Sequence, residues 1–261
     1  MSSPSPSPSP TRKVLVVGAT GATGKHVVRM LLDKGDTTVV AVTRSSARLL
    51  GLLNTTDDTD DNLMVREIAS LSDLTETDLS ELTDGCTAIV SCLGHNLTFR
   101  GMYKDGQFLT QIVRKLTAAM PSGCRFILMG SDGVSHDGDA PRSRAERTIL
   151  WLLRYLVPPH ADNEGAARCL RESPSSLKYC VARPGDLTDD ETDAKGYEVL
   201  DHPRGSLFGG DSTSRMQVAD CLVDLATMDP AVFDAKRNRT MPVVYSIPKE
   251  EEDGGGGKKT N

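Results

Sequence analysis

An apolar run followed by a glycine-rich segment is the feature that most restricts how this chain can fold. Val14–Val17 has the composition of a buried strand, Gly18–Gly24 carries a glycine at every third position, and a helical pattern begins at once. In such a unit the first glycine leaves the strand tightly, the second lets the backbone approach a pyrophosphate, and the third lets the helix pack on the sheet. The unpaired N–H groups at the helix start attract the phosphates.

We therefore predict a dinucleotide-binding turn; the alternative is a tight turn without a ligand. The residues expected to contact the dinucleotide are Gly18, Thr20, Gly21, Ala22, Thr23 and Gly24.

Apolar, β-branched segments alternate with helical ones along the chain. Strands are expected at 13–17, 38–43, 62–68, 87–92, 125–129 and 178–182. Helices are expected at 25–33, 73–82, 107–119, 162–172 and 218–228, and the apolar stretch 148–157 is predicted to be a core or subunit-facing helix. This alternation predicts βαβ units and a parallel sheet in one α/β domain, at about 12–247. The Ser-Pro repeat at 1–11 and the charged, glycine-rich segment 248–261 are expected to be disordered.

The end of the second predicted strand indicates which nucleotide the turn prefers. Enzymes that use NAD place a carboxylate there, about 20 residues past the glycines, to hold the ribose 2′-hydroxyl. This chain has Val42–Arg48 at that place, with no carboxylate. Arg44 can pair with a 2′-phosphate and Ser45 can donate to it. The sequence favours NADP(H); a solvated basic loop is the alternative.

The overall composition excludes several classes of function. A net charge of −6 gives no general attraction to nucleic acid or to anionic lipid. No apolar run has the length of a membrane span. None of the six cysteines forms the two-residue spacing of a zinc or redox motif. We expect a cytoplasmic protein with reduced, buried thiols and no metal.

Four segments together resemble the extended and atypical short-chain dehydrogenase/reductase superfamily, near the NmrA-like proteins and the biliverdin/flavin reductases. They are Gly18–Gly24, Ser91–Gly94, Met129–Ser131 and Ala182–Gly185. The resemblance implies a Rossmann-type, doubly wound parallel sheet with a small C-terminal substrate cap at about 186–240, which includes Phe208–Gly210. It also implies that Leu93 and Gly94 line the cofactor and that Pro184 backs the nicotinamide ring. The loop His95–Gly101 would either border the substrate or only carry the crossover.

The usual catalytic residues of the superfamily are only partly present. Ser131 occupies the place of its serine, but the Tyr-x-x-x-Lys pair is absent. In the equivalent region His160 precedes Glu164 at a spacing that places both on one helix face. Asp162 has the character of the N-cap of that helix. We expect Ser131 to hold the substrate, and either His160 or water to supply a proton.

Two functions fit this pattern. The first is an NADPH-dependent reductase of a small quinone-, flavin- or carbonyl-like acceptor. The second is a non-catalytic NADP(H) sensor of the NmrA-like type, which the missing Tyr-x-x-x-Lys favours. Neither requires nucleic acid or a membrane as a partner, and both are compatible with a homo-oligomer.

Overall fold

A computed structural model describes residues 12–54, 61–94, 107–190, 194–204 and 211–247. The strands are β1 (Arg12–Val17), β2 (Thr37–Thr43), β3 (Leu63–Glu67), β4 (Ala88–Ser91), β5 (Arg125–Met129), β6 (Lys178–Pro184), β7 (Asp186–Thr188), β8 (Tyr197–Leu200), β9 (Ser212–Ser214) and β10 (Val243–Ser246). The helices are α1 (Gly24–Asp33), α2 (Ser46–Leu53), the 3-10 turn η1 (Leu71–Asp73), α3 (Glu76–Thr83), α5 (Phe108–Ala119), α6 (Arg144–Leu156), α7 (Pro158–Arg171), α8 (Arg215–Thr227) and α9 (Pro230–Lys236).

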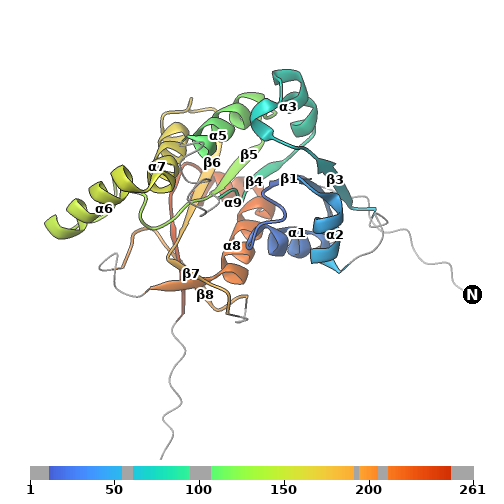
Figure 1. The fold of residues 1–261 in the computed structure, drawn as a ribbon. Coiled ribbons are helices and arrows are strands. Elements are labelled where there is room, and N and C mark those ends of the chain that lie inside the picture. The colour runs from blue at the N-terminus through green and yellow to red at the C-terminus, as the bar shows by residue number, and fades with distance from the viewer. Residues whose placement is uncertain (1–11, 55–60, 95–106, 191–193, 205–210, 248–261) are drawn as a thin grey trace, which may run out of the picture.

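The central sheet has eight strands in the order β3-β2-β1-β4-β5-β6-β10-β8. Every neighbouring pair is parallel except β10 with β8. Successive strands run outward in both directions from β1 and β4, so the order reverses between these two strands. Helices α1 and α8 lie on one face, and α3, α5 and α7 lie on the other (Figure 1). The predicted Rossmann-type, doubly wound fold is confirmed, and the reversal marks the place where such sheets bind ligands.

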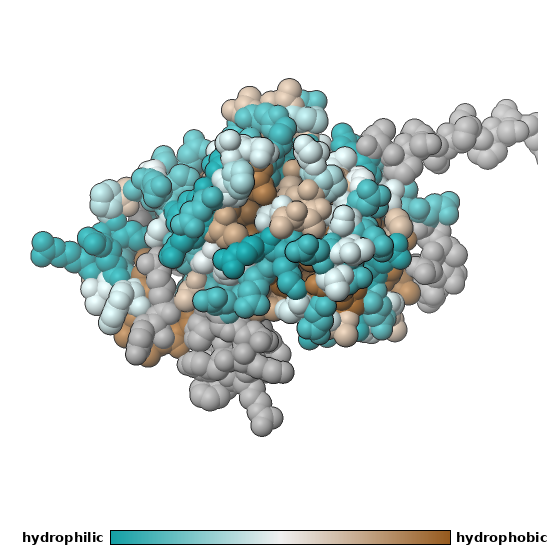
Figure 2. All heavy atoms as spheres, turned by 90° about the horizontal axis from the view of Figure 1, so that it is seen from above, coloured by the Kyte–Doolittle hydropathy of each residue, from teal (hydrophilic) through white to brown (hydrophobic). Residues whose placement is uncertain are grey.

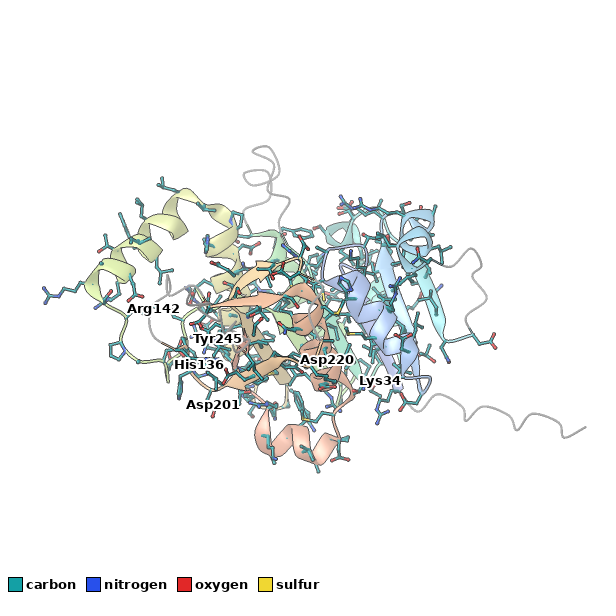
Figure 3. All side chains as sticks on the ribbon, turned by 90° about the horizontal axis from the view of Figure 1, so that it is seen from below. Lys34, His136, Arg142, Asp201, Asp220 and Tyr245 are labelled. Atoms are coloured by element: carbon teal, nitrogen blue, oxygen red, sulfur yellow. The ribbon has the colours of Figure 1, made fainter. Side chains whose placement is uncertain are left out.

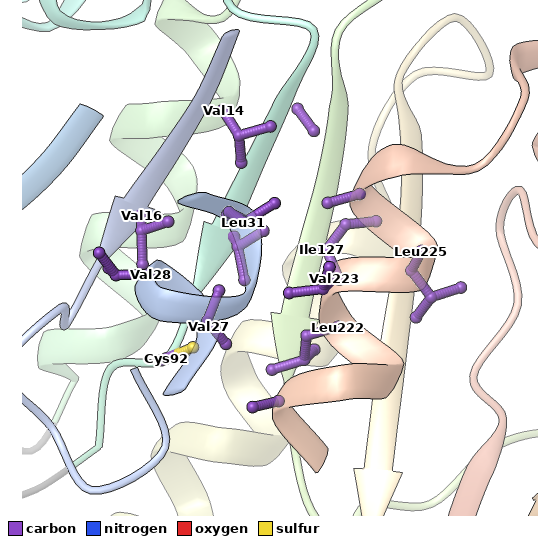
Figure 4. Close-up of a cluster of buried hydrophobic side chains, with 14 of the residues drawn as sticks. Val14, Val16, Val27, Val28, Leu31, Cys92, Ile127, Leu222, Val223 and Leu225 are labelled. Atoms are coloured by element: carbon purple, nitrogen blue, oxygen red, sulfur yellow. The ribbon is translucent and has the colours of Figure 1, made fainter. Parts of the chain in front are cut away.

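The two faces of the sheet hold two hydrophobic clusters. In β1 the four residues Val14–Val17 are all fully buried, and alternate side chains enter opposite clusters. This is why the strand is apolar throughout rather than alternating. In one cluster, α1 contributes Val27 and Leu31, and α8 contributes Leu222 beside them (Figure 4). The glycine-rich turn is thereby fixed at both ends, by a buried strand and by a buried helix face.

The segment expected to form the cap divides into two parts. Strands β7 and β9 pair in a small separate sheet, and β8 extends the main sheet by pairing with β10. Helix α8, which we expected in the cap, instead packs with α1 in the helical layer. Residues Phe208–Gly210 lie outside the described residues. Helix α8 therefore belongs to the helical layer of the main domain, and a substrate cap stays a prediction.

The apolar stretch at 148–157 is not a core helix. It lies within α6, which projects from the body of the protein (Figure 1). Leu150 is buried, but Ile149, Leu152 and Leu156 are 40%, 46% and 52% exposed. Hydrophobic side chains gather at the end of the molecule where α6 lies (Figure 2). A subunit-facing role for this helix stays a prediction.

The cysteines behave as the sequence predicts. Five of the six thiols are buried, and none forms a disulfide in the described chain. Burial raises the pKa of Cys86 to about 11 and that of Cys92 and Cys180 to about 12.

Within the described residues no His, Cys, Asp or Glu cluster could hold a metal ion. None of the helices in these residues has the length and the apolar run that a bilayer crossing requires.

The expected role of Asp162 is wrong. Helix α7 begins at Pro158, so Asp162 lies inside it rather than before it. Its carboxylate is buried and accepts hydrogen bonds from the backbone N–H of Leu109 at 2.6 Å and of Thr110 at 2.9 Å. The hydroxyl of Thr110 donates a third bond at 2.6 Å. Asp162 therefore caps the neighbouring helix α5, whose first N–H groups have no partner inside their own helix.

We expect Asp162→Ala to lower the free energy of unfolding by about 2–4 kcal/mol, because buried donors lose a charged acceptor. Urea unfolding measures the loss. Asp229→Ala is the matched control, since Asp229 caps α9 on the exposed surface through Ala231 and Val232. Its loss should be about 1 kcal/mol. Equal losses in the two variants would contradict the cross-helix cap.

Candidate functional site

The predicted site residues lie in order along one edge of the sheet. They follow or close the carboxyl ends of five adjacent strands: Arg44 after β2, Gly18 after β1, Leu93 after β4, Ser131 after β5 and Pro184 at the end of β6. At about 4.8 Å per strand, the row from β2 to β6 spans about 19 Å. This is the shape of a site for an elongated ligand that lies across the strand ends.

The turn after β1 is held by contacts that only glycine permits. Gly18 has φ +81°, and a Cβ on it would lie 2.7 Å from the carbonyl oxygen of Cys92. A Cβ on Gly24 would lie 2.1 Å from the carbonyl oxygen of Gly18. The backbone of the turn thus rests directly on the chain that leaves β4, next to Leu93. Gly24 allows the helix to pack closely, as predicted.

The N-terminus of α1 has the character of an anion site. Thr23 occupies its N-cap without a side-chain cap bond, and no acidic residue lies in the first turn. By contrast, side chains cap α3, α8 and α9. A Cβ on Gly21 would lie only 3.0 Å from the carbonyl oxygen of Gly18, so this surface of the turn is bare backbone. Bare backbone and the positive end of the helix dipole fit a pyrophosphate.

The two residues predicted to select NADP(H), Arg44 and Ser45, follow β2 and differ in their contacts. Arg44 is exposed and has no ion-pair partner in the described chain. Ser45 is the N-cap of α2, and its hydroxyl oxygen accepts a hydrogen bond from the N–H of Arg48 at 3.3 Å. A hydroxyl that accepts one bond still has its proton to donate. Ser45 therefore has a structural role that the sequence did not predict.

A carboxylate missed by the sequence analysis lies close to Arg44. Glu67 ends β3 opposite Thr43 of β2. It accepts hydrogen bonds from the N–H of Ser46 at 2.8 Å and from its hydroxyl at 2.6 Å. The Ser46 hydroxyl and N–H lower the pKa of Glu67. The end of β2 itself carries no carboxylate, as the sequence indicates, but Glu67 of the neighbouring strand β3 brings one to the same corner.

Ser131 and His160 border one small space. A Cβ built on Gly133 would lie 3.5 Å from Oγ of Ser131 and 4.0 Å from Nδ1 of His160. Helix α7 carries His160 in its first turn, followed by the buried Glu164. Glu164 accepts a hydrogen bond from the N–H of Ser135 at 3.2 Å, so it holds the loop after β5. The two residues predicted for chemistry are thus brought together from different elements.

Asp132 is a second residue that the sequence analysis missed. Its N–H donates to the carbonyl oxygen of Pro184 at 2.9 Å, and its own carbonyl accepts from Arg142 at 2.5 Å. Burial raises the pKa of its carboxyl, the charges of Arg142 and Arg183 oppose this, and the carboxylates of Asp186 and Asp211 support it, so that the pKa is about 6. This carboxyl, between Ser131 and the end of β6, is therefore a carboxylate only above about pH 6.

A buried ion pair fixes the loop that follows Ser131. Arg183 of β6 is fully buried, and its guanidinium donates to both carboxylate oxygens of Asp139, at 2.6 Å and 2.9 Å. It also donates to the carbonyl oxygens of Val134 and Met241. Burial alone would raise the pKa of Asp139, but the hydrogen bond and charge of Arg183 outweigh it, so the pKa is lowered. The loop is bonded directly to the centre of the sheet.

Gly94 and the loop His95–Gly101 were also expected at this edge of the sheet. Gly94 is exposed just beyond β4, and a Cβ on it would meet no atom within 4 Å. The loop His95–Gly101, for which we left two roles open, lies outside the described residues.

Comparisons with known proteins agree with this geometry. Residues 18–229 match the family of proteins described as NAD(P)H-binding. The comparison with curated proteins finds no match. Among solved structures, a proposed NADH-flavin reductase from Streptococcus pneumoniae is 17% identical, with a TM-score of 0.63 over 90% of this chain and 99% of that one. A short-chain dehydrogenase/reductase from Veillonella parvula in complex with NADP is 20% identical, with a TM-score of 0.63 over 90% and 94%. A protein from Lactobacillus casei is 17% identical, with a TM-score of 0.69 over 90% and 100%. At these identities the structures establish a shared fold.

Asp132→Asn should stabilise the protein in a pH-dependent way. The folded chain keeps this proton up to about pH 6, whereas the unfolded chain releases it near pH 3.8. Wild type therefore loses stability as the pH rises between these values, and the amide does not. We expect the gain in unfolding free energy to be about 2–3 kcal/mol larger at about pH 7.5 than at about pH 4.

Chemical unfolding of both proteins at the two pH values measures this gain. Asp33→Asn, at an exposed position in α1, removes the same charge and should give no such pH dependence. A gain that is the same at both pH values would show that Asp132 is not desolvated.

Proposed function

The chain belongs to the NAD(P)H-binding family, and from this premise we propose that it is an NADPH-dependent oxidoreductase of a small organic acceptor. The cofactor, when bound, supplies a hydride from the nicotinamide C4. One observation carries the proposal. The glycine-rich turn leads into a helix without an acidic residue in its first turn, and it lies on the same edge of the sheet as Ser131 and His160. Binding residues and residues able to handle a proton are thus within reach of one elongated ligand.

The cofactor would lie across the strand ends in one direction. Its pyrophosphate would lie on the turn, from Gly18 to Gly24, and its adenosine half toward Arg44 and Ser45. Leu93 and Gly94 would border the ribose and pyrophosphate with backbone, and Pro184 would back the nicotinamide. The residues proposed for the cofactor are Gly18, Thr20, Gly21, Ala22, Thr23, Gly24, Arg44, Ser45, Leu93, Gly94 and Pro184.

Two opposing charges bear on the choice between NADPH and NADH. Arg44 is exposed and has no ion-pair partner in the described chain, so it is available to a 2′-phosphate. Glu67 would repel that phosphate, but its carboxylate is engaged with Ser46 at the start of α2. Glu67 stays ionised but is exposed, so solvent and salt screen its repulsion, whereas Arg44 would bond the phosphate directly. We therefore propose NADP(H).

The residues at the nicotinamide end would position the acceptor. The hydroxyl of Ser131 would donate a hydrogen bond to the acceptor oxygen. The loop that carries Ser135, which Glu164 holds in place, would shape the site. The proton that follows the hydride comes either from His160 or from water. Because Ser131 alone can orient an acceptor that takes its proton from solvent, we propose water as the source.

A non-catalytic NADP(H) sensor is the second candidate. The absence of Tyr-x-x-x-Lys favours it, since that pair would supply the usual acid. A sensor would bind NADPH at the same turn but would not oxidise it, whichever acceptor is offered. Turnover with a panel of quinones, flavins and aldehydes separates the two functions.

Arg44→Ala should weaken NADPH binding by about tenfold and leave NADH binding unchanged, because only NADPH carries the 2′-phosphate. Calorimetric titration with each nucleotide measures both affinities. Arg114→Ala, which removes an exposed arginine of α5, is the control and should change neither. If wild type binds NADPH and NADH equally, the assignment of NADP(H) fails.

Ser131→Ala should lower NADPH-dependent turnover, while His160→Ala should remain within a few-fold of wild type. Turnover of wild type should then be nearly flat between about pH 6 and 8, because no histidine titrates in the step. Steady-state rates across this range measure both effects. General acid catalysis contributes about 10²–10⁴ in rate, so a hundredfold loss in His160→Ala with intact NADPH affinity would assign the proton to His160.

A further inference from the structure

A large cavity lies beside the proposed reaction centre, between the loop after β5 and helix α6. Its volume is about 820 Å³, and its wall includes His136, Arg142, Arg144, Arg147 and Trp151. His136 and Arg142 lie at the end of the molecule that α6 occupies (Figure 3). This space is large enough for a ligand of several rings.

The cavity adjoins Ser131 and His160 through one side chain. Leu150 lines the cavity, and its Cδ2 would lie 3.9 Å from a Cβ built on Gly133. The same position is 3.5 Å from Oγ of Ser131 and 4.0 Å from Nδ1 of His160. The buried Leu150 therefore separates the cavity from Ser131 and His160 by the thickness of one side chain.

The charges on the wall are mostly positive. Arg144 and Arg147 have no ion-pair partner in the described chain, and Arg142 is bonded only to the carbonyl oxygen of Asp132 among the contacts described. Asp139 is the acidic residue of the wall, and the buried Arg183 already neutralises it. In a chain with a net charge of −6, this excess of positive charge at one cavity is an attraction for anions.

His136 adds a neutral donor to the same wall. Burial lowers its pKa, and the charge of Arg183 lowers it further. Its Nδ1 accepts a hydrogen bond from the N–H of Gly138 at 3.1 Å. In the neutral ring the proton is then on Nε2, which can donate to a ligand oxygen. Asp139, which is paired with Arg183, also accepts a hydrogen bond from the N–H of His136 and so holds the loop that carries this histidine.

Helix α6 presents a basic face with one tryptophan to the cavity. Surface helices turn apolar side chains inward and charged ones to solvent. Here Arg144, Arg147 and Trp151 repeat at helical spacing on the cavity side. All three side chains are exposed, Trp151 to 64%, so the cavity is open to solvent on the side of α6. A ligand that enters from solvent can therefore contact the two arginines and the tryptophan.

We propose that this cavity binds the acceptor, and that the acceptor carries a carboxylate or a phosphate attached to an aromatic ring. The arginines hold the anionic group, since guanidinium binds both oxyanions in a bidentate manner. Trp151 covers the ring, and Leu150 directs it toward Ser131. This inference rests on the proposed reductase function and names the substrate class of that site.

The single tryptophan of the chain reports on this cavity directly, because it is Trp151. We would titrate the full chain with benzoate, phenyl phosphate and the neutral benzamide, and follow tryptophan fluorescence. One or both anions should change the fluorescence and bind at least about tenfold more tightly than benzamide. The preferred anion identifies carboxylate or phosphate as the recognised group. Equal binding of benzamide, or no response to either anion, would overturn the proposal.

A double variant tests the residues. Arg144→Gln with Arg147→Gln should weaken the preferred anion by about tenfold or more and leave benzamide unchanged. Arg168→Gln, at an exposed position of α7, is the matched control and should retain wild-type affinity. Thermal unfolding verifies that all variants are folded. Unchanged anion affinity in the double variant would also overturn the proposal.

The reductase function is tested separately in the same proteins. If aromatic aldehydes with and without a carboxylate are reduced equally well, the acceptor class is wrong while the reductase function holds. If the anions bind at Trp151 but no acceptor oxidises NADPH, the cavity still binds anions, and both the reductase function and the cavity's role as an acceptor site are wrong.

Discussion

The carboxyl edge of the sheet depends on a contact between two backbones. Gly18 leaves β1 so close to Cys92 that no side chain fits between them, and Gly24 rests in turn on the carbonyl of Gly18. Three segments, the end of β1, the start of α1 and the exit of β4, therefore pack backbone against backbone, in addition to their buried side chains. Side chains change rotamer, but a backbone packed on backbone does not. The positive end of the α1 dipole therefore has a fixed position at the carboxyl edge of the sheet. The surface that the turn presents there is peptide backbone.

A second anchor holds the opposite end of the crevice by different means. At β6 the buried Arg183 binds Asp139 and the carbonyl of Val134, so a loop carries its geometry from an ion pair rather than from packing. Removing one partner of such a pair leaves a buried charge, which costs about 3–5 kcal/mol. The two ends of the site thus differ in character: bare peptide backbone forms the cofactor end, and a buried ion pair holds the acceptor end.

The sequence predicted best what is decided locally. Strand and helix positions, the glycine turn and Ser131 after β5 follow from the period of apolar residues and from short spacings. Asp162 was misread because an aspartate near the start of a helix has the pattern of its own cap, whereas the nearby α5 offered unpaired N–H groups. Glu67 and Asp132 were missed because their roles depend on strands distant in the sequence. Helix α6 was misread because its apolar residues predict a buried face, whereas Ile149, Trp151 and Leu152 are all exposed.

The buried thiols have a consequence for how this protein meets oxidants. A thiol reacts as its thiolate, and with pKa values near 11 and 12 Cys86, Cys92 and Cys180 are almost entirely protonated at neutral pH. Peroxides and disulfides in solvent therefore find no reactive sulfur at these positions while the core is closed. Their labelling by a thiol reagent would report the opening of the sheet core and not the state of the crevice. The chain that binds a carrier of reducing equivalents thus keeps these sulfurs outside the exchange of electrons.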